Sequence, residues 1–147
     1  AAIKGMGKSM KARVSWHQDV SFVAESGSGH AMVVDGAPEH GGRNIGPRPM
    51  ELILMGLGSC ASFDVIAILK KQRQAIKTCE CVLEAERVDA VPAVFTKITM
   101  HFQVSGDNLD SGKVERAVAL SAEKYCSASK MLEDAGVELA HRVTLTS

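Results

Sequence analysis

The sequence predicts an α+β fold whose elements follow the order βββ-α-ββ-αα-β. Two observations carry this prediction. Several short segments alternate apolar and polar residues, which is typical of half-buried strands, and one long segment is apolar on nearly every side, which is typical of a buried helix. The 147 residues show no repeat and no internal linker, so we expect a single domain over residues 1–147. Residues 1–9 are expected to be a disordered tail or an expression remnant.

Three strands are expected at the start of this domain. Residues 11–16, 20–25 and 30–35 have strand-like patterns, and a Ser/Gly turn at residues 26–29 separates the second from the third. We therefore predict an antiparallel meander. Residues 35–48 contain four glycines and two prolines without periodicity, which predicts a loop that is either mobile or part of a site.

A long apolar helix follows the loop. Pro49 suits the first helical position, where its missing N–H costs nothing, and we expect the helix to run to about Gln74. Such a helix needs cover on every side, so we predict that it packs at a homodimer interface. Its length would fit a membrane span, but Glu51 and Asp64 interrupt the apolar run, so we expect no membrane partner.

The rest of the chain predicts a hairpin, two helices and a final strand. Asp110 or Ser111 is the expected cap of the first helix, and Ser127 that of the second. In chain order these elements are expected at residues 78–88, 94–104, 113–125, 127–136 and 137–145.

Composition excludes several function classes. The 17 basic and 17 acidic residues cancel and no Lys/Arg run occurs, so we expect no nucleic-acid partner. Four cysteines in a chain without an apolar export signal predict a reducing cytoplasm. Cys79 and Cys81 share one strand face without further ligands, and the five histidines show no ligand spacing, so we expect no metal and no cofactor.

Cys60 and Cys126 are the candidate functional residues. Cys60 lies in the apolar helix, with Gly56 one turn before it, expected to leave room for the sulfur, and Asp64 one turn after it. Cys126 lies where one helical segment ends and another begins, and a helix N-terminus favours the thiolate. Two such thiols can form a reversible disulfide and pass two electrons to an oxidant. The alternative is that each is a small buried core residue.

The segments around these cysteines, Pro49-x-Glu51-Leu…Gly-x-Gly-Ser-Cys60 and Lys124-Tyr125-Cys126-Ser127, resemble the OsmC/organic-hydroperoxide-resistance superfamily, and within it the YhfA-like branch. The resemblance spans nearly the whole chain from Met10. It implies an OsmC-like fold, an intertwined homodimer in which two sheets wrap two central helices. It also implies thiol-dependent reduction of organic hydroperoxides, with Cys60 as the peroxidatic cysteine, Cys126 as the resolving cysteine and an external dithiol as reductant.

The chain departs from the family pattern at the residues that activate the thiol. The family carboxylate, directly after the proline, corresponds here to Met50, and the family arginine has no match in the first hairpin, because residues 16–35 contain no arginine. On a regular helix Glu51 lies about 180° from the reactive cysteine. The remaining candidates for activation are Glu51, Arg48, Arg43 and Asp64. The alternative function is a non-catalytic small-molecule-binding or redox-sensing stress protein that keeps the fold without the activating pair.

Overall fold

The computed structural model describes residues 9–147. The chain divides into two compact units, with the boundary between Leu52 and Ile53. The single domain over residues 1–147 stays a prediction. The expectation for residues 1–9 falls, except at Ser9, outside the described residues.

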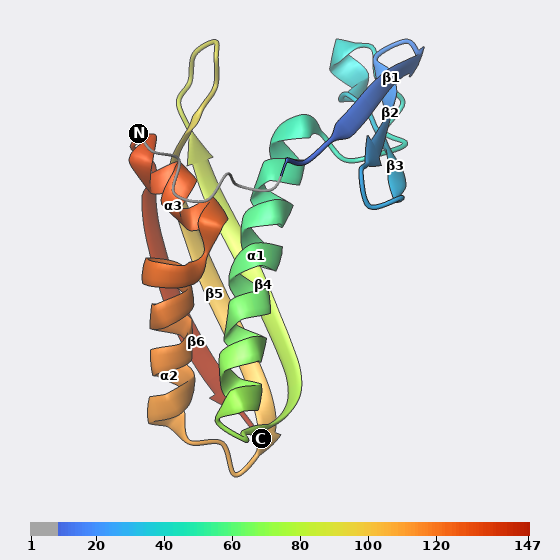
Figure 1. Cartoon of the computed structure of the whole chain (residues 1–147). Helices are drawn as coiled ribbons and strands as arrows, with labels where there is room; N and C mark the ends of the chain where they lie inside the picture. Colours follow the sequence, from blue (N-terminus) through green and yellow to red (C-terminus); the bar gives the residue numbers. More distant parts are fainter. Residues whose placement is uncertain (1–8) are drawn as a thin grey trace, which may run out of the picture. The chain divides into compact units, whose positions relative to one another are not determined.

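The first unit contains a three-stranded antiparallel sheet. Strands β1 (Ala12–Gln18), β2 (Ser21–Ser26) and β3 (Ala31–Val34) pair in the order β1-β2-β3 (Figure 1). The predicted meander is confirmed. Gly29, in the turn before β3, has a φ of 93°, a left-handed conformation that glycine adopts without strain.

One carboxylate organises the loop that follows this sheet. Asp35 is buried and accepts backbone N–H groups from Gly36 at 2.7 Å, Arg43 at 2.9 Å and Ile45 at 3.3 Å. The hydrogen bond from Arg43 is the main cause that lowers the pKa of Asp35, while burial acts against it. The predicted loop thus closes around a buried charge and includes the short 3₁₀ helix η1 (Pro38–His40).

Helix α1 (Pro49–Lys71) is continuous over 23 residues and ends three residues before the expected limit. By length and composition alone it could cross a membrane. In the second unit one side of this helix faces the core, while Ile53, Met55 and Phe63 are exposed, Phe63 to 75%. The buried residues of the helix are Leu57, Gly58, Ala61, Val65 and Leu69.

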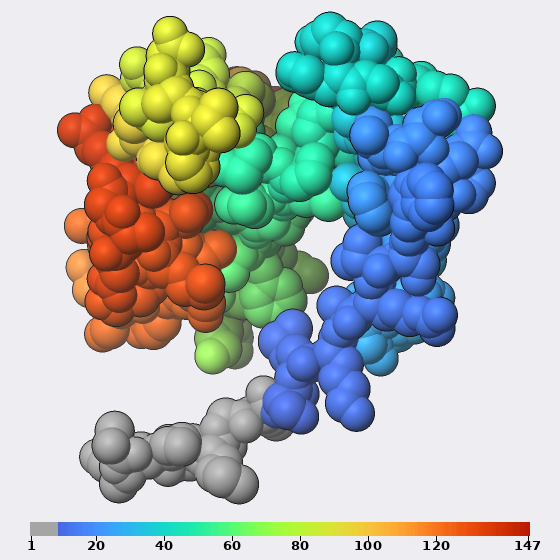
Figure 2. Space-filling model, turned by 90° about the horizontal axis from the view of Figure 1, so that it is seen from above, coloured from blue at the N-terminus to red at the C-terminus, as the bar shows by residue number. Residues whose placement is uncertain are grey.

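The second unit is built on a mixed three-stranded sheet. Strands β4 (Ala75–Arg87) and β5 (Phe95–Asp107) form the predicted antiparallel hairpin, and β6 (Glu138–Thr146) pairs with β5 in parallel. The helices lie over one face of this sheet (Figure 1). Figure 2 views this unit from the end where the β4–β5 turn (yellow) projects, beside the orange-red atoms of α3. Every second residue of β5 faces the helices and is buried: Ile98, Met100, Phe102 and Val104.

Two helices with an irregular junction complete the unit. Helix α2 (Ser111–Leu120) is capped by Asp110, whose carboxylate accepts the Lys113 N–H at 3.1 Å, and it continues into a π turn, η2 (Ser121–Tyr125). Helix α3 (Ser127–Asp134) follows directly. The expectation that Ser127 caps α3 is wrong, because the cap is Cys126, whose Sγ accepts the Ser129 N–H at 3.4 Å. The fold is therefore mixed α+β, with two sheets and three α-helices in the described residues.

Candidate functional site

Cys60 lies two residues past a point where α1 approaches β4 closely. A Cβ atom built on Gly58 would lie 2.6 Å from Leu83 Cδ1, so glycine allows this close contact. The expectation that Gly56 leaves room for the Cys60 sulfur is not supported within this chain, because a Cβ atom built at Gly56 would meet nothing within 4 Å. Cys60 is half-buried and is a free thiol.

Cys126 is the more enclosed thiol, with 3% of its surface exposed. Burial is the main cause that raises the pKa of Cys126. Ser129 acts in the opposite direction, through its backbone N–H and its hydroxyl. The Ser129 hydroxyl is itself buried and makes no hydrogen bond within the described chain. The raised pKa favours the protonated thiol of Cys126, and the Ser129 N–H is a donor already in place for the thiolate.

The two cysteines predicted from the sequence lie together. The Cys60 thiol is a neighbour of the Cys126 thiol and further raises the Cys126 pKa. The arrangement pairs a half-exposed thiol on α1 with a buried thiol at the start of α3.

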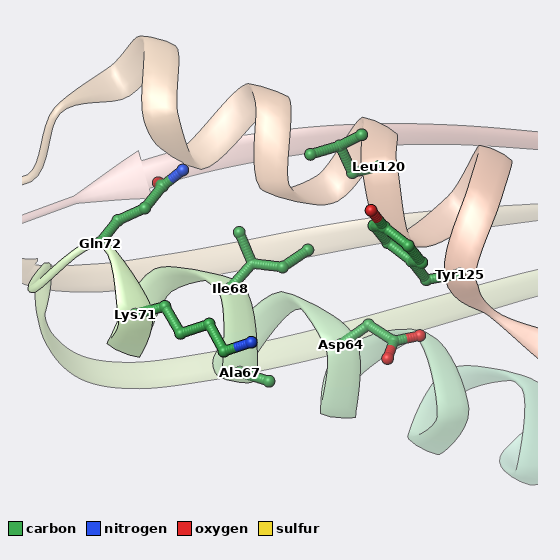
Figure 3. A pocket seen from close by; sticks show the side chains of 7 residues that line it. All are labelled: Asp64, Ala67, Ile68, Lys71, Gln72, Leu120 and Tyr125. Atoms are coloured by element: carbon green, nitrogen blue, oxygen red, sulfur yellow. The ribbon is translucent and has the colours of Figure 1, made fainter.

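A pocket of about 460 Å³ opens between α1 and the α2–η2 segment (Figure 3). Asp64, one turn after Cys60, and Tyr125, directly before Cys126, both line it. The Tyr125 ring also contacts the Lys124 ammonium, 5.5 Å from the ring centroid. The other lining residues are Ala67, Ile68, Lys71, Gln72 and Leu120. The pocket thus combines apolar walls with a few polar groups, as ligand sites commonly do.

Glu51 and Arg48 are bonded to each other at the start of α1. The Arg48 N–H donates to Glu51 Oε1 at 2.8 Å, in the manner of a capping box, and the Arg48 guanidinium donates to Asn44 Oδ1 at 2.9 Å and Gly46 O at 3.0 Å. The helix between Glu51 and Cys60 is unbroken, so the two side chains leave it on opposite sides, about two and a half turns apart.

Arg43, the remaining candidate for activation, forms an exposed ion pair with Asp19, at 3.8 Å. Of the four residues considered for thiol activation, only Asp64 shares the helix face of Cys60, and only Asp64 lines the pocket.

The other two cysteines, Cys79 and Cys81, lie on strand β4. Both are half-buried, and burial raises the pKa of each. The pKa of Cys81 reaches about 11: the Cys79 thiol raises it further, and a hydrogen bond with Ser62 lowers it. Within residues 9–147, no group of three or more His, Cys, Asp or Glu residues is arranged to hold a metal ion.

Two serines of the site have no role in the sequence-based prediction. Ser129 carries a local signal, because a residue three positions into a helix commonly bonds to the cap. Ser121 carries none: its hydroxyl donates to the Ala61 carbonyl at 2.7 Å, a contact between residues 60 positions apart.

Comparison with known proteins identifies the family. Residues 40–142 match the family model described as OsmC-like protein, which is well over half of the chain. The chain belongs to the OsmC-like family. Protein YhfA of Escherichia coli K12 is 46% identical over 132 residues, which cover 90% of this chain and 95% of YhfA.

Several solved structures share this fold. A hypothetical protein from Aquifex aeolicus VF5 superposes with a TM-score of 0.79 at 27% identity, covering 95% of this chain and 99% of its own. An organic hydroperoxide resistance protein, OsmC, from Legionella pneumophila has a TM-score of 0.70 at 16% identity, covering 93% and 97%. At that identity the likeness concerns the fold alone. The predicted family and fold class are confirmed.

Proposed function

We propose that this OsmC-like protein is a cytoplasmic, thiol-dependent peroxidase that reduces organic hydroperoxides. Its family supports a role in stress response, and the fold is shared with a protein named for organic hydroperoxide resistance. The observation that carries the proposal is that a half-exposed thiol, Cys60, is a neighbour of a buried thiol, Cys126, while Asp64 and Tyr125, close to them in the chain, line a largely apolar pocket.

The chemistry assigns the attack to Cys60. Its thiolate attacks the outer oxygen of the hydroperoxide, the O–O bond breaks, and the alkoxide leaves as an alcohol after taking a proton; the sulfur, oxidised by two electrons, becomes a sulfenic acid. Cys126 then attacks that sulfur, an S–S bond forms, and water leaves. An external dithiol reduces the disulfide. Greater exposure supports Cys60 as the first sulfur to meet the oxidant.

The pocket supports a substrate with an apolar body. Ala67, Ile68 and Leu120 form the apolar walls, and in the proposal Asp64 accepts the hydroperoxide O–H while the O–O bond faces Cys60. An ionised carboxylate disfavours a nearby thiolate, so Asp64 serves the substrate better than it serves the thiol. Glu51 and Arg48 remain proposed site residues at the start of α1, where the Arg48 backbone N–H donates to Glu51 Oε1.

A homodimer is part of the proposal. The exposed side of α1 carries Ile53, Met55 and Phe63, large apolar side chains with exposed fractions of 46%, 52% and 75%. Apolar residues gathered along one exposed helix side are typical of an interface. Light scattering at known concentration should give the mass of two chains.

Hydroperoxide consumption tests the activity. The purified protein should consume cumene hydroperoxide stoichiometrically with an added dithiol, and Cys60→Ser should abolish the reaction. Cys79→Ser and Cys81→Ser are matched controls, since they remove half-buried thiols outside the pair and should retain turnover. Turnover no faster than in a no-enzyme control would exclude the peroxidase.

One observation favours a second function, a non-catalytic binding or redox-sensing protein. Glu51 and Arg48 are both engaged in local bonds at the start of α1. Retained binding of a small apolar ligand after Cys60→Ser, without any reaction with peroxide, would favour the binding protein. Slow oxidation accompanied by a change in association would favour the sensor.

A further inference from the structure

A single buried residue connects the helix of Cys60 with the turn that carries Cys126. Ser121 begins η2 and is fully buried. Its hydroxyl donates to the carbonyl oxygen of Ala61, the residue directly after Cys60, at 2.7 Å. Its own carbonyl oxygen accepts the N–H of Cys126 at 2.9 Å. A short chain of two hydrogen bonds therefore runs from the backbone beside one thiol to the backbone of the other.

We infer that Ser121 is a positioning residue that holds Cys126 against Cys60 and so favours disulfide formation between them. The inference takes its biological meaning from the proposed function. It also gives a reason for the π turn: the Cys126 N–H bonds five residues back, so the residue whose hydroxyl reaches α1 is also the one whose carbonyl holds the backbone of Cys126.

The Ser121 hydroxyl is suited to this task because it adds a bond without being needed to satisfy the helix. A carbonyl inside an α-helix already accepts the amide four residues later, so Ala61 offers its second lone pair to Ser121. Removal of the hydroxyl consequently leaves no unpaired buried group. What is lost is the restraint between α1 and η2, and with it part of the effective concentration of one thiol at the other.

Equilibration with glutathione tests the inference without any peroxide. In the reaction, glutathione disulfide and the two protein thiols give the Cys60–Cys126 disulfide and two molecules of glutathione; the protein sulfurs lose the two electrons that the glutathione disulfide gains. The full chain carries Cys79→Ser and Cys81→Ser, so that only this pair reports. The equilibrium constant measures the effective concentration of the two thiols.

Ser121→Ala should lower this effective concentration by about five-fold, the value expected for one hydrogen bond. Ser59→Ala is the matched control: Ser59 is next to Cys60, and its hydroxyl also donates to a carbonyl of α1, that of Met55 at 2.8 Å, but it has no link to Cys126. It should leave the constant unchanged. Equal constants for wild type and Ser121→Ala, or equal losses in both variants, would overturn the inference.

A second pair of variants separates positioning from packing. Ser121→Thr and Ser121→Val have the same shape, and only the threonine keeps a hydroxyl. The threonine variant should have the higher effective concentration, and equal values would overturn the inference even if Ser121→Ala did not fold. Failure of the peroxidase, by contrast, would appear as missing hydroperoxide consumption with this equilibrium still intact.

Discussion

The close contact between α1 and β4 predicts an unusual outcome for a glycine-to-alanine change. Gly58 lies inside α1, where alanine is normally favoured over glycine by about 1 kcal/mol. Here, however, the added Cβ would lie 2.6 Å from Leu83 Cδ1, with Cδ2 at 3.5 Å and Cγ at 3.6 Å. Overfilling a packed core costs about 1–3 kcal/mol. We therefore expect Gly58→Ala to change the free energy of unfolding by between about zero and a 2 kcal/mol loss.

A double-mutant cycle isolates this contact. Leu83→Ala removes the three atoms that the new Cβ would meet, so in that background Gly58→Ala should stabilise the protein by about 1 kcal/mol. The coupling between the two positions should then be about 1–3 kcal/mol. Urea unfolding of the four proteins, with thiols reduced and protein concentration fixed, measures it. If Gly58→Ala has the same effect in the wild-type and in the Leu83→Ala background, the contact does not explain the glycine.

Three further predictions concern titrating groups. Because hydrogen bonds lower the pKa of Asp35, the carboxylate stabilises the fold above its unfolded pKa, and this contribution is lost as the pH falls through the lowered value. The difference in stability between wild type and Asp35→Asn, measured by acid unfolding, should therefore disappear at low pH. A difference that does not depend on pH would contradict this. Because the pKa of Cys81 is raised to about 11, the free energy of unfolding should fall as the pH rises from about 9 toward that value. Cys81→Ser should lose this part of the pH dependence. Parallel plots of stability against pH for the two proteins would argue against a buried thiol. Ser129→Ala removes a donor that lowers the pKa of Cys126. The Cβ chemical shift of Cys126 should therefore titrate at a higher pH than in wild type. An unchanged midpoint would show that the Ser129 hydroxyl does not act on Cys126.

Elements with a strong local pattern were predictable from the sequence. The β4–β5 hairpin was predictable because every second residue of β5 is buried, because Cys79, Cys81 and Leu83 of β4 are half-buried, and because the alternation of apolar residues records both. The start of α1 at Pro49 was also predictable, since proline fits the first turn of a helix. The parallel pairing of β5 with β6 was not predictable, because the residue pattern of a strand does not specify which strand it pairs with or in which direction.

Within the candidate site, residue types were more predictable than contacts. Cys60 and Cys126 were found from their positions in helical segments. The cap formed by the Cys126 sulfur was missed because Ser127 is the stronger capping residue by type. Ser121 was missed because a hydrogen bond to a carbonyl 60 residues away leaves no periodic signal in the sequence. The lowered pKa of Asp35 was not predictable either, because it depends on the path of a loop that no sequence pattern specifies.

Oxidation with one equivalent of cumene hydroperoxide, followed by peptide mapping under non-reducing conditions, tests the central claim most directly. The account predicts a single new disulfide that joins the peptide of Cys60 to that of Cys126, with Cys79 and Cys81 recovered as free thiols. Recovery of both Cys60 and Cys126 as thiols, or a disulfide that joins Cys79 and Cys81 instead, would contradict it.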